Sequence, residues 1–136
     1  MVKVIIGKKG TGKTKALIDM VNSEVKSAHG SFVCIEKGNK LTYDISHDAR
    51  LIDIAEYPLE GYQGLIGFVS GILAGNYDVC DIFIDSILKM AGFDFNELGN
   101  FLDRLEILTE KNKVNFVITV SADESEVPES VKKYVG

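Results

Sequence analysis

Apolar and polar stretches alternate along this chain in a pattern that predicts strands and helices in turn. Five short apolar stretches have the length and composition of strands, and they cover residues 2–6, 31–36, 50–55, 81–85 and 114–120. The spacing of apolar residues predicts helices over about residues 12–28, 61–74 and from residue 94 onward. Because strands and helices alternate throughout, we expect an α/β protein with a mainly parallel sheet between layers of helices.

Two of these helices carry further local signals. The second contains four glycines between Gly61 and Gly71, which favour close packing of this helix against the sheet. Asp94 and Glu97 have the spacing of a capping box and open the third helix. Residues 122–136 form a polar tail, in which we expect at most a short helix after Pro128.

Length and composition indicate one ordinary domain over residues 1–136. The chain is long enough for a single core, and its 46% hydrophobic and 26% charged residues are typical of globular proteins. No apolar run approaches the roughly 18 residues that span a bilayer, and the N-terminus lacks signal-peptide features. We therefore expect no membrane insertion and a cytoplasmic location. The net charge of −5 does not support nucleic acid as the main partner.

The cysteines and histidines do not have the spacing of a metal site. Cys34 and Cys80 each lie in an apolar, strand-like stretch without a second cysteine nearby, which favours reduced core residues over a zinc or redox role. His29 and His47 have no partner at metal-ligand spacing, so surface or capping roles are expected. The candidate chemistry therefore lies with other residue types.

The strongest motif follows the first predicted strand. The sequence GKKGTGKT, from Gly7 to Thr14, matches the phosphate-binding pattern G-x-x-x-x-G-K-[ST] and lies between a strand and a helix, as that pattern requires. Its glycines let the backbone turn tightly, so that successive N–H groups point inward at the positive end of the helix. Lys13 would then reach the β- and γ-phosphates, and the Thr14 hydroxyl would help to hold Mg²⁺.

The motif predicts that ATP or another nucleoside triphosphate binds with Mg²⁺ at the sheet edge. The residues expected to contact the nucleotide here are Gly7, Lys8, Lys9, Gly10, Thr11, Gly12, Lys13, Thr14 and Lys15. Lys8 and Lys9 fill variable positions of the motif. They either add positive potential around the phosphates or are simply solvated.

Asp85 supplies the second half of the predicted site. It ends the strand IFID, so its side chain should emerge at the same sheet edge as the loop and hold Mg²⁺, often through water. The alternative is an aspartate that caps a turn at the end of a strand. Many ATPases place a glutamate directly after this aspartate to polarise the attacking water, and here that position is Ser86. A general base must therefore come from another strand.

Glu36 ends the second predicted strand, FVCIE, and would flank the same crevice if that strand lies beside IFID. With FVCIE, IFIDSI and VNFVITVSA in this order after the phosphate loop, residues 1–122 resemble the RecA-like ATPases. The resemblance implies a three-layer α/β/α P-loop NTPase fold with strand order 3-2-4-5-1. It also implies that Glu36 and Lys13 are catalytic and that Ser121 senses the γ-phosphate. The alternative for Glu36 is a solvated strand terminus.

The chain departs from that family in two respects. RecA-like recombinases carry DNA-binding loops and extra strands after the fifth, which this sequence does not show. Its only arginines are Arg50 and Arg104, and Arg104 lies within the long helix, where an exposed ion pair is expected. Fast hydrolysis would therefore need a positive charge from a neighbouring copy or a protein partner.

Two remaining groups have alternative explanations. An acidic group in the tail is either solvated or docks a partner, and it consists of Asp123, Glu124, Glu126 and Glu129. An aromatic group either stacks on adenine or packs between helix and loop, and it consists of Tyr57, Tyr62 and Phe68.

Three functions fit these patterns. The leading one is an ATP-binding domain with slow or partner-stimulated, Mg²⁺-dependent ATPase activity. The second is a nucleoside or nucleotide kinase, since thymidine kinases share this strand order, although they carry an Asp-Glu pair and a cysteine-rich zinc segment where this chain has Asp85-Ser86 and no such segment. The third is a non-hydrolysing, nucleotide-dependent module that controls a partner.

Overall fold

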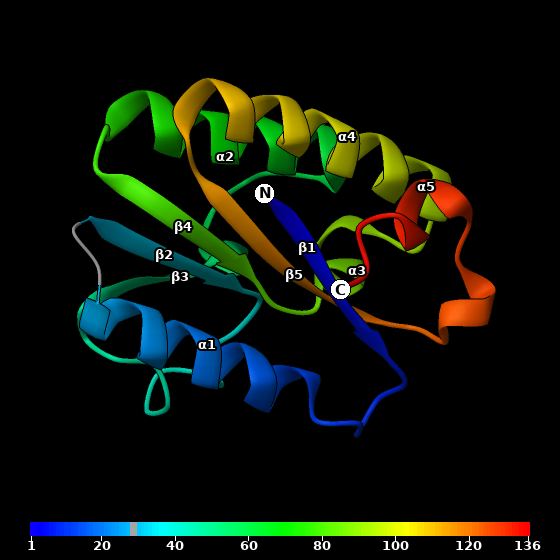
Figure 1. Cartoon of the computed structure of the whole chain (residues 1–136), viewed down its shortest axis with the longest axis horizontal. Helices are drawn as coiled ribbons and strands as arrows, with labels where there is room; N and C mark the ends of the chain where they lie inside the picture. The colour runs from blue at the N-terminus through cyan, green and yellow to red at the C-terminus, as the bar shows by residue number, and fades with distance from the viewer. Residues whose placement is uncertain (28–29) are drawn as a thin grey trace.

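The computed structural model describes residues 1–27 and 30–136 and contains a five-stranded sheet between layers of helices (Figure 1). The strands are β1 (Val2–Gly7), β2 (Ser31–Glu36), β3 (Ala49–Asp53), β4 (Val79–Ile84) and β5 (Asn115–Ser121). The helices are α1 (Lys13–Ser27), α2 (Gly61–Gly75), α3 (Ile87–Ala91), α4 (Phe95–Asn112) and α5 (Glu129–Lys132), with 3-10 helices η1 (Ile54–Glu56) and η2 (Glu124–Glu126). The predicted end of the first helix, at Ala28, and the predicted surface role of His29 lie outside the described residues.

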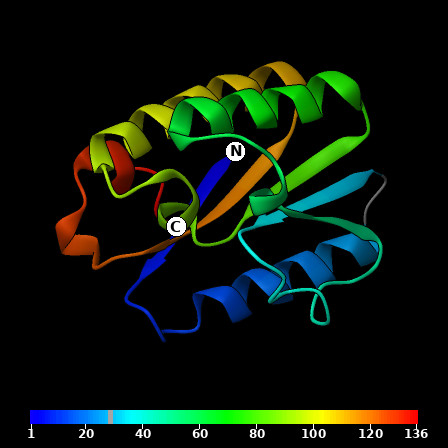
Figure 2. The same cartoon turned by 180° about the vertical axis from the view of Figure 1, so that it is seen from behind.

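The strands pair in parallel in the order β1-β5-β4-β2-β3. This is the predicted order 3-2-4-5-1 counted from the opposite edge, so the three-layer α/β/α prediction is confirmed. Helices α2 and α4 cover one face of the sheet and α1 covers the other, which Figure 2 shows from behind. Near the C-terminus, Val135 forms a parallel bridge with Val4 beside the β1 edge.

The strands bury alternate side chains in two separate cores, as expected for a sheet covered on both faces. The core on the α1 face contains Leu17, Val21, Phe32, Cys34, Phe83 and Val117. The core under α2 and α4 contains Val33, Ile35, Ile82, Ile84, Phe116 and Ile118. Because side chains alternate along a strand, Glu36, Asp85 and Thr119 continue the rows that face α1.

The structure corrects the prediction for the α2 glycines. Cβ atoms added at Gly67 or Gly71 would meet nothing within 4 Å, whereas the helix buries Leu65 and Val69. Gly67 and Gly71 are therefore exposed and do not pack closely against the sheet. Only Gly64 approaches a neighbour closely, with its added Cβ 3.1 Å from the Cβ of Leu59.

Side-chain caps shift one predicted boundary and confirm another. The third strand ends at Asp53 rather than residue 55, because the Asp53 carboxylate accepts the N–H of Ala55 at 2.9 Å and starts η1. Asp94 caps α4 by accepting the N–H groups of Asn96 and Glu97, and a reciprocal capping box is formed farther along by Asp123 and Glu126.

The C-terminal tail is less solvated than its polar composition predicts. A short helix follows Pro128 as expected, but Val127 is 4% exposed and Val131 is fully buried. The hydroxyl of Tyr134 also donates to Asp103 of α4 at 2.6 Å. The tail therefore packs on α4 and extends the core.

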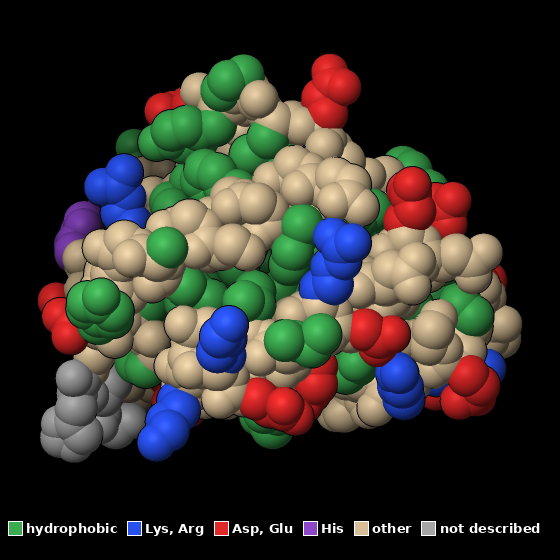
Figure 3. Space-filling model, turned by 90° about the horizontal axis from the view of Figure 1, so that it is seen from above, with side chains coloured by type: hydrophobic (Ala, Val, Ile, Leu, Met, Phe, Trp, Pro, Cys, Tyr) green, Lys and Arg blue, Asp and Glu red, His purple; other side chains and the backbone are tan. Residues whose placement is uncertain are grey.

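Charged and hydrophobic side chains share the surface of the molecule. Figure 3 shows the molecule from above, with acidic and basic side chains interspersed on this face and hydrophobic side chains between them. None of the helices in the described part of the chain is long and apolar enough to cross a membrane. Both cysteines are free, and burial, with smaller contributions from Asp85 and Glu36, raises the pKa of Cys34.

Candidate functional site

The loop from Gly7 to Thr14 connects the carboxyl end of β1 to the first turn of α1. A Cβ on Gly7 would lie 2.6 Å from the Thr11 hydroxyl oxygen, so only glycine fits this loop conformation. Gly12 has a φ of 86°, in the left-handed region that favours glycine. The two glycines fixed by the motif are therefore required by the shape of the loop itself.

Hydrogen bonds to one carbonyl close the loop. The Lys8 carbonyl accepts the Thr11 hydroxyl at 2.7 Å and the Lys13 ammonium at 2.9 Å. Lys13 is only 8% exposed, and burial lowers its pKa while the charge of Asp85 opposes that shift. The Lys13 ammonium is thus folded back over the loop, within the field of Asp85.

Asp85 directly follows β4 and meets the end of this loop. Its two carboxylate oxygens each lie 3.3 Å from the Thr14 hydroxyl. Its Oδ1 also accepts the Thr119 hydroxyl at 2.7 Å, and its Oδ2 accepts the Ser86 hydroxyl at 3.4 Å. A carboxylate that is only 8% exposed is therefore surrounded by hydroxyl donors.

The topology of the sheet explains this convergence. Strand β5 lies between β1 and β4, and the last β4–β5 pair in register is Ile84 with Ile118. The next residues, Asp85 and Thr119, both face α1 because side chains alternate along each strand. The α1 helix begins on that same face, so Thr14 in its first turn reaches Asp85.

Glu36 ends β2, on the other side of β4, and is 4% exposed. Its carboxylate oxygens accept the N–H of Leu41 at 3.2 and 3.3 Å, which fixes the turn that follows the strand. Burial raises the pKa of Glu36, the N–H groups of Leu41 and Lys40 oppose the shift, and the charges of Asp85 and Asp53 add to it. Glu36 is therefore a buried acid within the electrostatic reach of Asp85, and it also anchors a turn.

The other residues predicted to contact the nucleotide lie around the loop. Ser121 is half-buried and pairs in register with Gly7 across β5 and β1. Lys8 and Lys9 are exposed, and the Lys8 ammonium lies 3.4 Å from Asp123. Lys15 points along the surface of α1, where it lies 3.4 Å from Asp19. Ser121 is thus adjacent to the loop backbone, whereas the ammonium groups of Lys8 and Lys15 pair with acids.

The residues at the site suit Mg²⁺ only in combination with a phosphate. Thr14 and Asp85 bring hydroxyl and carboxylate oxygens together, which are the hard donors that Mg²⁺ prefers. Among the described residues no group of three or more His, Cys, Asp or Glu side chains is placed to hold a metal. Mg²⁺ commonly binds one or two protein carboxylates, waters and substrate phosphates, so this donor set fits a metal that arrives with a nucleotide.

Two residues of this region were missed from the sequence. Thr119 is 1% exposed and donates the shortest hydrogen bond to Asp85. Its signal was a polar residue inside the otherwise apolar stretch FVITV. Asp53 accepts the N–H of Gly38 at 2.8 Å and so holds the turn after Glu36 against β3. That contact links residues whose pairing depends on the strand order, so no local pattern predicts it.

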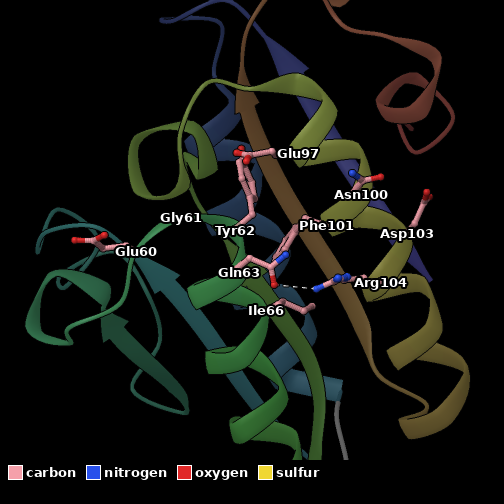
Figure 4. A pocket seen from close by; sticks show the side chains of 10 residues that line it. All are labelled: Glu60, Gly61, Tyr62, Gln63, Ile66, Glu97, Asn100, Phe101, Asp103 and Arg104. Carbon is pink, nitrogen blue, oxygen red and sulfur yellow. Dashed lines mark hydrogen bonds between the residues drawn. The ribbon is translucent and has the colours of Figure 1, made fainter.

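A groove between α2 and α4 lies apart from these residues. It has a volume of about 470 Å³, and Figure 4 shows the ten residues that line it, none of which belongs to the predicted site. The rings of Tyr62 and Phe101 pack there at 5.6 Å. Arg104 donates to Gln63 at 3.1 Å across the groove, an amide contact rather than the ion pair that we expected.

The aromatic group is explained by packing. The Tyr57 and Phe68 rings lie 5.4 Å apart, and the buried Tyr62 donates its hydroxyl to the carbonyl of Gly92 at 2.8 Å. These contacts connect α2 to its neighbouring loops. The hydroxyls and charges that the motif predicts gather instead at the carboxyl edge of the sheet, and we place the candidate site there.

Comparisons with known proteins support the fold. No protein-family model matches the sequence, and no curated protein matches it either. Among solved structures, the crystal structure of flagellar accessory protein FlaH from Methanocaldococcus jannaschii is similar to this chain, with a TM-score of 0.60 and 18% identity. The match covers 97% of this chain and 65% of the FlaH chain, so this chain spans less than two thirds of its neighbour. The similarity supports the α/β fold with a parallel five-stranded sheet between layers of helices.

Proposed function

We propose that this protein binds a nucleoside triphosphate together with Mg²⁺ and hydrolyses it slowly or on stimulation by a partner. The observation that carries the proposal is the 3.3 Å approach of the Thr14 hydroxyl to both oxygens of Asp85, at the end of a loop whose shape requires glycine at positions 7 and 12. The motif supplies inward N–H groups and the α1 terminus for the phosphates. Thr14 and Asp85 would hold the metal, which would neutralise charge on the phosphates.

The lysines of the loop and Ser121 have defined parts in this proposal. Lys13 would leave the Lys8 carbonyl and donate to the β- and γ-phosphates, a stronger acceptor than a neutral carbonyl. Ser121 would lie beside the γ-phosphate, since it is paired in register with Gly7. Lys8, Lys9 and Lys15 would contribute positive potential from the rim rather than direct contacts.

Hydrolysis would depend on Glu36 as the general base. Burial raises the pKa of this carboxyl group, which brings it closer to the pH at which a base works best. The charge of Asp85 adds to that rise in pKa, which supports a position of Glu36 near the same crevice. A positive side chain would be needed to stabilise the negative charge on the leaving phosphates. It would come from a second copy or a partner, because Arg104 is bound to Gln63 in the α2–α4 groove.

A specific observation also favours a second candidate, a nucleotide-dependent module that does not hydrolyse. Both oxygens of Glu36 accept the N–H of Leu41, so the carboxylate already has a structural role in the turn after β2. A base would have to keep one lone pair free for water. If the turn retains both oxygens, the bound nucleotide would control the shape of that turn instead of being cleaved.

Binding of a fluorescent ATP analogue, measured with and without Mg²⁺, tests the proposal. Lys13→Ala removes a charge-assisted contact and should weaken binding about 10- to 150-fold, the equivalent of roughly 1.5–3 kcal/mol. Lys26→Ala, in the last turn of α1, removes an equal charge far from the loop and should leave binding unchanged. Equal affinities of the wild type and Lys13→Ala would contradict the proposal.

A further inference from the structure

The shortest hydrogen bond to Asp85 comes from a residue outside the phosphate-binding motif. The Thr119 hydroxyl donates to Asp85 Oδ1 at 2.7 Å, whereas Thr14 and Ser86 lie at 3.3 and 3.4 Å from the carboxylate. Thr119 is 1% exposed and belongs to β5, the strand between the loop strand and the Asp85 strand. The orientation of the carboxylate is therefore set mainly from β5.

The same hydroxyl also holds the backbone next to Asp85. Thr119 Oγ1 accepts the N–H of Ser86 at 2.7 Å. Ser86 has a φ of 56° and a ψ of 56°, a left-handed conformation that is uncommon for a residue other than glycine. One buried hydroxyl thus donates to the carboxylate and accepts from the strained residue after it, a combination that a hydroxyl side chain can make and a hydrocarbon cannot.

We infer that Thr119 is a positioning residue that orients the Asp85 carboxylate toward Thr14 for Mg²⁺-nucleotide binding. This inference rests on the proposed nucleotide site. The Thr119 hydroxyl occupies one lone pair of Oδ1. The other lone pair of Oδ1, together with Oδ2, then faces the Thr14 hydroxyl. Partners that orient a metal ligand typically change metal affinity by about 10- to 100-fold when they are removed.

Three variants separate this role from packing. Thr119→Val keeps the shape and removes the hydroxyl, and Thr119→Ser keeps the hydroxyl and removes the methyl group. Val117→Ala is the packing control, because Val117 is 4% exposed in the same strand and on the same face. Fluorescent ATP-analogue binding is titrated with Mg²⁺ and repeated in EDTA, and thermal unfolding of each variant is recorded.

We expect Thr119→Val to raise, by about 10-fold or more, the Mg²⁺ concentration that gives half of the maximal enhancement of ATP-analogue binding. Binding of the analogue in EDTA should be unchanged. Thr119→Ser and Val117→Ala should keep the wild-type Mg²⁺ requirement, although Val117→Ala unfolds at lower temperature. If Thr119→Val does not fold, Thr119→Cys replaces it, because its thiol is a weak donor and acceptor of similar size.

The outcomes distinguish the two levels of the proposal. A wild-type Mg²⁺ requirement in Thr119→Val, or in Thr119→Cys where that variant is used, overturns the positioning role alone. The positioning role is also overturned if Thr119→Ser loses the Mg²⁺ effect as fully as Thr119→Val. The loss would then not be caused by removal of the hydroxyl, which serine retains. A wild-type protein that binds no nucleotide overturns the proposed function, and the inference with it.

Discussion

Replacement of Glu36 by glutamine distinguishes a protein that hydrolyses its nucleotide from one in which the bound nucleotide only controls the turn after β2. Glutamine has nearly the same shape and keeps one carbonyl oxygen to accept the N–H of Leu41, which now donates at 3.2 and 3.3 Å. It cannot take a proton from water at neutral pH. The substitution therefore removes the proposed base and preserves most of the turn.

The expected effect on rate is large and that on binding is small. A general base contributes about 10²- to 10⁴-fold, so loss of Glu36 should slow hydrolysis by that factor, the equivalent of roughly 3–5.5 kcal/mol in the barrier. Nucleotide affinity should stay near the wild-type value, because Glu36 is outside the Gly7–Thr14 loop.

Stability should respond to pH in a defined direction. The folded-state pKa of Glu36 is raised, mainly by burial, so the folded protein prefers the neutral carboxyl. This contribution to stability is complete below the unfolded pKa of about 4.3 and is lost as the pH rises through the folded pKa. Glu36→Gln does not ionise, so relative to the wild type it should gain stability between about pH 4 and neutral pH.

Single-turnover hydrolysis of Mg²⁺-ATP measures the effect on rate. Urea unfolding at about pH 4 and at neutral pH measures the effect on stability. Glu110→Gln, at an exposed position late in α4, controls for the loss of a carboxylate. Hydrolysis by Glu36→Gln within about twofold of the wild type would refute the role as a base, since such a factor is under 0.5 kcal/mol. Hydrolysis that is undetectable in the wild type as well would favour the non-hydrolysing module.

Three further substitutions test local features of the fold. Gly67→Ala fills open space on α2 and should stabilise the protein by about 0.5–1 kcal/mol, seen as a rise of roughly 2–5 °C in thermal unfolding, and a fall would contradict the exposed position. Gly99→Ala would place a Cβ 2.4 Å from the Ser130 hydroxyl oxygen and should cost about 1–3 kcal/mol in urea unfolding by displacing α5, whereas an unchanged midpoint would show that α5 moves freely. Ser86→Gly relieves a left-handed residue and should stabilise the fold by about 0.5–1 kcal/mol, and destabilisation would show that the Ser86 side chain matters more than its backbone strain.

The order of the elements was predictable because it depends on local patterns. Blocks of apolar residues at strand length, such as residues 31–36, favour a strand buried on both faces, and the structure has β2 over the same six residues. The tail was harder to interpret. Its charged residues predict solvation, but Val127 and Val131 are spaced to reach a core that exists only after α4 has packed on the sheet.

The candidate site also contains residues that local sequence patterns indicate and a contact that only the fold defines. The glycines and Thr14 are contiguous in sequence, and Asp85 ends an apolar run, so their types and spacing indicate a phosphate and metal site without any knowledge of the fold. Thr119 acts on Asp85 across 34 residues of sequence, through a pairing of β4 with β5 that only the strand order defines. A threonine in an apolar strand is equally compatible with a buried hydroxyl that bonds its own backbone. The sequence therefore indicates which groups could meet a nucleotide, whereas the hydroxyl that orients the metal carboxylate emerges only when the strands are side by side.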